Sequence, residues 1–227
     1  MISATQAKRT LKDQNRWQLW LVIAANTLFL YGVIQANAIE LSGLKGVFTD
    51  AKNLVSVGFA VLIATVISGF VSADMKARIV FLRWRNALPG HRAFTHYGPR
   101  DSRIDLQRLA AIHGTLPADA HEQNRLWYRI FKTIDELPHI SQLHRDFLLL
   151  RDYTAIALLC LVIYGGFAIA MIRSGRVCFF YLALLVAQLI VVRQAAFHYG
   201  VRLVTNTLAT AALQPQKPSP RSRKKSA

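Results

Sequence analysis

Four apolar stretches constrain the fold of this chain most, because they lie in two pairs on either side of a long polar segment. The first pair is Trp17–Val33 and Leu54–Val71, and the second pair is Tyr153–Ile172 and Val177–Val192. Each is close to the ~20 residues that an α-helix needs to cross the hydrocarbon core of a bilayer. The sequence therefore predicts an all-α integral membrane protein, with four transmembrane helices in two hairpins and a helical cytoplasmic lobe between spans two and three.

The distribution of charge indicates which parts of the chain face the cytoplasm. The chain carries 28 Lys+Arg against 12 Asp+Glu, a formal net charge of +16. Basic residues collect on the cytoplasmic side of membranes and meet anionic lipid headgroups there. In this chain they concentrate in the N-terminal arm, the middle segment and the C-terminal tail, and they far outnumber Arg173 and Arg176 between spans three and four. We therefore expect a multi-pass membrane protein with both termini cytoplasmic, lipid headgroups as partners and no direct DNA binding.

These expectations divide the chain into five parts. In order they are a basic cytoplasmic arm (1–16), transmembrane hairpin one (17–72), the cytoplasmic helical lobe (73–152), transmembrane hairpin two (153–200) and a basic, largely disordered cytoplasmic tail (201–227). The tripeptide Ala36-Asn37-Ala38 is similar to a signal cleavage site. The apolar run before it is longer than the roughly 7–15 residues typical of a signal peptide, so we expect span one to remain uncleaved.

Small and polar residues within the spans predict how the helices pack. Span two carries a small residue at every fourth position, which forms a groove for another span or for a second copy of the chain. These residues are Ser56, Ala60, Ala64, Ser68 and Ser72. Gly165 and Gly166 in span three permit close helix approach or a bend. Asn26, in the middle of span one, either bonds across a helix interface or belongs to a polar pathway. We expect a homo-oligomer.

Turn and capping residues predict the helices of the lobe. The helix of span two runs on past the membrane and ends near Pro89. A first short helix is capped by Asp101 or Ser102, and a second opens near Pro117. A long helix then starts at Pro138 and continues into span three without a break.

One stretch of the lobe combines arginines with aromatic residues. Guanidinium groups bind phosphate oxygens in pairs, and aromatic faces stack on bases. This combination predicts a site for a nucleotide-like or phosphorylated ligand, formed by Arg83, Arg85, Arg92, Arg100, Arg103 and Tyr97. In the alternative interpretation, the arginines contact lipid headgroups and pair with Asp101, Asp105 or Asp152.

No motif in the chain points to catalysis. The sequence has no nucleophile elbow, phosphate-binding glycine loop or dinucleotide-binding fingerprint. Six histidines lie in the lobe, but their spacing matches no zinc signature. We therefore expect no enzyme activity, no catalytic residues, no metal site and no cofactor.

The architecture as a whole resembles the small multi-span membrane effectors of bacterial anti-phage and toxin systems. The resemblance is carried by the short chain, the paired spans, the basic lobe and the lack of an enzyme motif. It implies a location in the bacterial inner (plasma) membrane. It also implies that the cytoplasmic lobe senses a phosphorylated or nucleotide ligand, or a partner protein, and that the spans then alter membrane integrity. Two other functions remain open: a channel or transporter subunit, and a membrane scaffold that anchors a cytoplasmic partner.

Overall fold

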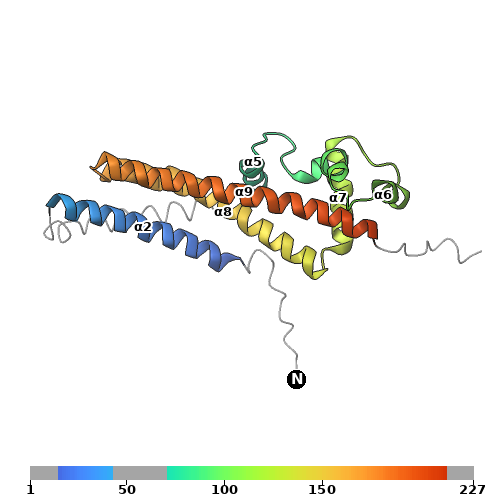
Figure 1. Cartoon of the computed structure of the whole chain (residues 1–227), viewed down its shortest axis with the longest axis horizontal. Helices are drawn as coiled ribbons and strands as arrows, with labels where there is room; N and C mark the ends of the chain where they lie inside the picture. Colours follow the sequence, from blue (N-terminus) through green and yellow to red (C-terminus); the bar gives the residue numbers. More distant parts are fainter. Residues whose placement is uncertain (1–14, 43–70, 214–227) are drawn as a thin grey trace, which may run out of the picture. The chain divides into compact units, whose positions relative to one another are not determined.

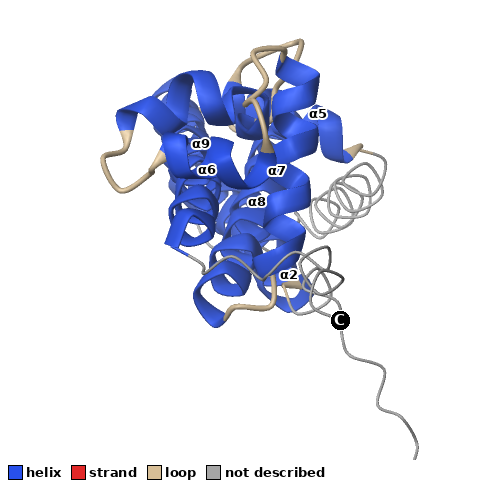
Figure 2. Ribbon diagram, turned by 90° about the vertical axis from the view of Figure 1, so that its right-hand side faces the viewer, coloured by secondary structure: helices blue, strands red, loops and turns tan. Residues whose placement is uncertain are grey.

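The structure is a computed structural model, and it describes residues 15–42 and 71–213. Within these ranges every regular element is helical, as Figure 2 shows by its single element colour. The elements are α2 (Arg16–Ser42), α5 (Ala73–Phe81), the short turns η1 (Pro89–Arg92), η2 (Ala93–Tyr97) and η3 (Gly98–Arg100), α6 (Leu106–His113), α7 (Ala120–Ile134), α8 (Pro138–Met171) and α9 (Gly175–Leu213) (Figure 1). The predicted all-α class is confirmed for the described part of the chain.

Three of the described helices are long and apolar enough to cross a membrane. They are α2 over Trp17–Ala36, α8 and α9. Helix α9 exposes large apolar side chains such as Phe179, Ile190 and Val191. Such a surface is unfavourable in water and is solvated by lipid. The three helices could therefore span a membrane, which is consistent with the predicted membrane protein. The predicted span two lies almost wholly outside the described residues.

The chain divides into two compact units. Unit one comprises the residues up to 87 together with 144–199, and unit two comprises 88–143 together with the residues from 200 onward. Helices α8 and α9 each contribute to both units and run through the change of unit without a break. Of the predicted lobe, 73–152, residues 88–143 belong to unit two and the remaining residues belong to unit one.

The core of unit one forms where α2, α8 and α9 meet. Leu30 from α2, Tyr164 from α8 and Leu185 from α9 are almost fully buried in one apolar cluster. Figure 1 shows α8 and α9 side by side. Gly165 permits this approach, because a Cβ atom there would lie 3.1 Å from Leu182 Cδ2.

The core of unit two includes the last turns of α9. Val204 and Leu208 from α9 are fully buried against Phe94, Leu109 and Ile130. Helix α9 therefore extends to Leu213, into the first part of the segment 201–227 that was expected to be a basic tail. Apolar residues four positions apart share one helix face, and burial of that face holds these turns in place.

Helix α5 is a separate element, which corrects the predicted continuation of span two. Ser72 has an extended backbone, and its Oγ accepts a hydrogen bond from the Met75 backbone N–H at 3.2 Å. This is the geometry of an N-cap, where a helix begins. The helix ends at Phe81, because Leu82 adopts a left-handed conformation with a φ of 50°. Both events precede Pro89, where the sequence placed the end.

The other lobe helices follow the predicted order with shifted starts. Helix α6 is capped by Asp105, whose carboxylate accepts from the Arg108 backbone N–H at 2.8 Å, and not by Asp101 or Ser102. Helix α7 is capped by Asp119 and begins at Ala120. Helix α8 starts at Pro138 and is continuous to Met171, so the predicted long helix is confirmed.

Candidate functional site

A group of charges joins α5 to α8 in unit one. The Lys76 Nζ atom lies 3.3 Å from an Asp152 carboxylate oxygen, and Arg151 Nη2 lies 3.0 Å from the same oxygen. The three side chains are 7–14% exposed. Charges withdrawn from water to this extent are stable only when they are paired. The two cations therefore depend on the single carboxylate of Asp152.

A second polar contact joins α5 to α9. Arg193 Nη1 donates to the Val80 carbonyl oxygen at 3.0 Å. Val80 lies in the last turn of α5, whose carbonyls have no partner within the helix. A cation there also meets the negative end of the helix dipole. Phe81 adds apolar contacts in the same region, with its ring centroid 6.3 Å from that of Phe147 and 5.6 Å from that of Phe197. We call Lys76, Val80, Arg151, Asp152 and Arg193 the boundary cluster.

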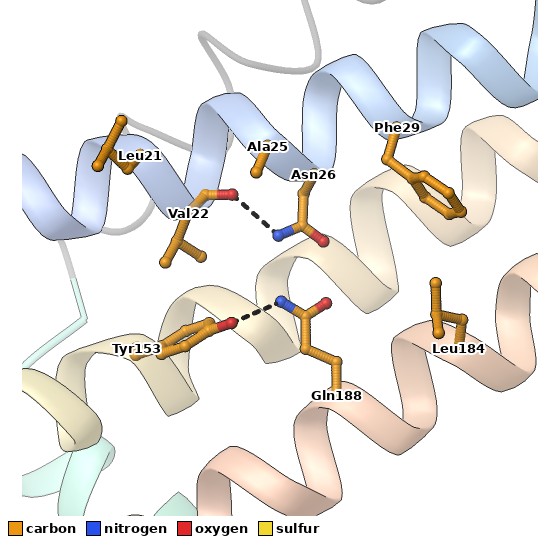
Figure 3. A pocket seen from close by; sticks show the side chains of 8 residues that line it. All are labelled: Leu21, Val22, Ala25, Asn26, Phe29, Tyr153, Leu184 and Gln188. Carbon is orange, nitrogen blue, oxygen red and sulfur yellow. Dashed lines mark hydrogen bonds between the residues drawn. The ribbon is translucent and has the colours of Figure 1, made fainter.

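An open groove of about 520 Å³ lies between α2, α8 and α9. Its walls are mostly apolar, with three polar side chains, and Figure 3 shows Asn26 and Gln188 pointing toward one another. Gln188 Nε2 donates to the Tyr153 hydroxyl at 3.0 Å. The lining residues are Leu21, Val22, Ala25, Asn26, Phe29, Tyr153, Leu184 and Gln188.

Asn26 bonds within its own helix, which differs from the predicted bond across a helix interface. Its Nδ2 donates to the Val22 carbonyl oxygen at 2.9 Å (Figure 3). The hydrogen bond between helices is made by the neighbouring Thr27, whose Oγ1 lies 2.9 Å from the Tyr164 hydroxyl oxygen. The Asn26 amide therefore lines the groove rather than joining two helices.

A buried glutamine organises unit two. The Gln123 side chain of α7 is 2% exposed. Its Oε1 accepts from the backbone N–H groups of Phe94 and Thr95 at 3.1 and 3.2 Å, and its Nε2 donates to the Ala118 carbonyl oxygen at 2.9 Å. Gly90 lets η1 approach the same helix, because a Cβ atom there would lie 2.9 Å from Trp127 Cε3. The irregular backbone of 88–100 is therefore fixed by α7.

The six predicted ligand residues are divided between the units. Arg83 and Arg85 belong to unit one, and Arg92, Tyr97, Arg100 and Arg103 belong to unit two. In unit two, Tyr97 is buried in the apolar core, while Arg92 and Arg100 are exposed. Arg100 Nη1 donates to His96 Nε2 at 2.8 Å. Among the described residues, neither Arg92 nor Arg100 pairs with a carboxylate, so both keep an exposed, unpaired positive charge.

Arg103 is engaged by an acid. Its Nε and Nη2 donate to the two carboxylate oxygens of Asp101 at 2.9 and 2.6 Å. The hydrogen bond from Arg103 lowers the pKa of Asp101 despite partial desolvation of the carboxyl, and the same bond raises the pKa of Arg103. This is one of the pairings expected in the alternative interpretation. The other two acids act elsewhere, Asp105 as a helix cap and Asp152 in the boundary cluster.

The predicted packing residues are described only in part. Ser56, Ala60, Ala64 and Ser68 lie outside the described residues. Ser72 caps α5 and is not part of a helical face. Gly165 faces Leu182, whereas a Cβ atom on Gly166 would meet nothing within 4 Å. In the ranges 15–42 and 71–213, no group of three or more metal-ligating side chains comes together.

The sequence did not suggest that the residues of the boundary cluster lie together. The sequence suggested Asp152 only as a partner for the arginines between 83 and 103. One available signal was the charge that directly adjoins each apolar stretch, Asp152 before span three and Arg193 after span four.

Comparison of the chain with protein-family models, curated proteins and solved structures found no match.

Proposed function

We propose that this chain is a multi-span protein of the bacterial inner membrane, with four transmembrane helices and both termini in the cytoplasm. In this proposal it acts as an effector in anti-phage defence or as a toxin-like protein. Residues of unit two receive a phosphorylated or nucleotide-like ligand, or a partner protein. The response is a change in the packing of the spans that alters membrane integrity.

The continuity of α8 and α9 supports this proposal most. Each helix is apolar enough to cross a membrane and also contributes residues to unit two. In α9, Val204 and Leu208 are core residues of unit two, while Tyr181 and Leu185 are core residues of unit one. A helix without a break transmits a displacement of one end to the other, because its backbone hydrogen bonds resist bending.

Arg92 and Arg100 are the proposed ligand contacts. Both side chains are exposed, and in the part of the chain that the structure describes neither pairs with a carboxylate. Guanidinium groups in this state bind phosphate with charge-assisted hydrogen bonds. Arg103 is a weaker candidate, because Asp101 already occupies its donors on one edge.

The test is induced expression of the chain in a bacterial host, read with a dye that reports membrane potential. We expect growth arrest and depolarisation, relieved by Arg92→Ala and Arg100→Ala. Arg125→Ala is the matched control, because Arg125 is an exposed arginine of unit two that pairs with Glu122 on the surface of α7. Depolarisation that is absent although the protein reaches the membrane would contradict the proposal. Recovery of one stoichiometric partner protein without a membrane effect would instead favour a scaffold.

The groove supports a second candidate function, a channel or transporter subunit. Polar groups within membrane helices commonly mark a solute or ion pathway. Asn26, Tyr153 and Gln188 come together from three helices at this groove. Solute flux into vesicles containing the purified protein, reduced by Gln188→Leu and unaffected by Arg92→Ala, would select this function over the effector.

A further inference from the structure

The boundary cluster fixes the depth of α5 relative to the membrane helices. Asp152 directly precedes the apolar stretch of α8 that begins at Tyr153, and Arg193 directly follows the apolar stretch of α9 that ends at Val192. Charged side chains at these positions lie where hydrocarbon gives way to headgroups. Both contact α5, through Lys76 and through the Val80 carbonyl oxygen. Two independent contacts thus place α5 at headgroup level.

Beside these contacts, α5 and the turn after it expose apolar side chains. Trp84 is 78% exposed, Leu82 is 70% exposed and Met75 is 43% exposed. Leu82 and Asn86 both have a positive φ, of 50° and 51°. L-residues other than glycine rarely adopt this conformation, so the surrounding fold must impose it. The turn therefore holds Leu82 and Trp84 outward instead of letting them pack inside.

Two arginines alternate with these apolar residues. Arg83 and Arg85 flank Trp84, and within the described ranges no carboxylate lies within ion-pair distance of either. The Arg85 side chain is exposed, and the Arg83 side chain is half-buried with its Nη1 atom inaccessible. The other two cations of this segment each have a carboxylate partner, since Lys76 pairs with Asp152 and Arg78 Nη2 lies 2.6 Å from Asp74 Oδ2. The uncompensated charge is thus concentrated at Trp84.

We propose that residues 75–85 form an interfacial anchor, which inserts Leu82 and Trp84 among the headgroups of the bilayer that the chain spans. Arg83 and Arg85 bind the phosphates of anionic phospholipids in the same layer. A protruding tryptophan is favoured at this depth, because its ring is apolar and its N–H bonds to polar headgroups. Arginine beside it gains attraction from anionic lipid. This inference does not depend on the effector function proposed above.

The test is quenching of Trp84 fluorescence by brominated phospholipids in nanodiscs. The chain has four tryptophans, so the Trp84 signal is obtained as the difference between the wild-type protein and Trp84→Phe. Trp84 is exposed, so this substitution leaves the core intact. We expect a loss of Trp84 fluorescence that is larger with bromines close to the headgroup than with bromines near the chain ends. The matched control is Trp127→Phe, since Trp127 lies in unit two and stacks on Phe131; its difference signal should be unquenched.

A second experiment varies the charge of the lipid. In nanodiscs containing phosphatidylglycerol, Trp84 should be quenched less in the double variant Arg83→Glu/Arg85→Glu than in the wild-type protein. In nanodiscs of phosphatidylcholine alone, Trp84 quenching should be the same in both proteins. Arg125→Glu/Arg129→Glu, which changes the same charge in unit two, should have no effect. Trp84 that is quenched by aqueous iodide but by no brominated lipid would overturn the proposal. Inorganic phosphate added to the detergent-solubilised protein provides a further check. If it changes Trp84 fluorescence as much as phosphatidylglycerol does, the proposal is overturned, because the site would then bind a free anion.

Discussion

Replacing Asp152 by asparagine should release α5 from α8. The carboxylate of Asp152 is the only acid that the described structure places against Lys76 and Arg151, and all three side chains are 7–14% exposed. Removing one partner of a buried ion pair typically costs about 3–5 kcal/mol, because the remaining charge stays buried and unpaired. Lys76 has a flexible stem that can carry its ammonium group to water or headgroups. Asp152→Asn should therefore reduce the free energy that holds α5 against α8 by about 3 kcal/mol, the lower end of this range.

The assay is hydrogen exchange of the α5 amides, residues 73–81, in protein reconstituted in nanodiscs. A loss of about 3 kcal/mol raises the population of the undocked helix and its exchange rate roughly a hundred-fold. Lys76→Met should cost less, about 1 kcal/mol, because Asp152 keeps Arg151 as its partner. In the double variant the two losses should not add, since both act on one interaction. Unchanged α5 exchange in Asp152→Asn, or a larger effect of Lys76→Met, would refute this reasoning.

Three further predictions concern unit two. Gln123→Leu leaves the Phe94 and Thr95 N–H groups without their acceptor and should destabilise the unit by about 2–4 kcal/mol, measured as hydrogen exchange across 88–134. Gly90→Ala places a Cβ atom against Asn124 and Trp127 and should cost about 1–3 kcal/mol, whereas Gly166→Ala, with open space around it, should cost nothing by thermal unfolding. Asp101→Asn removes the pair with the exposed Arg103 and should cost about 0.5 kcal/mol at neutral pH. Because the folded pKa of Asp101 lies below its ordinary value of 3.8, this difference should be complete at neutral pH and should disappear as the pH falls below about 4 in a pH series of unfolding midpoints.

Local sequence patterns predicted the helical elements well where one pattern dominates. The apolar stretches after Tyr153 and Val177 lie within α8 and α9, and the uninterrupted start of α8 at Pro138 is confirmed. Cap positions were predicted less well, as with Asp105 in place of Asp101. Several acids in this region are equally good caps by type. Only the packing of the neighbouring turns decides which of them is used.

The sequence suggested residues that could bind a ligand, but it did not show how they are arranged. Arginines between 83 and 103 were identified as binding residues, and the structure separates them between two units. Tyr97 was expected to stack on a ligand, yet it is buried in the core of unit two. The sequence shows that basic and aromatic residues are close along the chain. It does not show which side of an irregular backbone each of them faces.

By itself, the sequence determined that this protein is helical and that its apolar stretches are long enough to cross a membrane. These properties depend on residues close together along the chain, because helix periodicity and apolar length are local. The tertiary structure alone decided that Arg193 caps a helix whose last turn contains Val80, 113 residues earlier, and that the turns of α9 after residue 200 build the core of unit two. Such contacts depend on which helices meet. That is decided by the burial of apolar faces and the pairing of charges across the whole fold, which no single stretch of sequence contains.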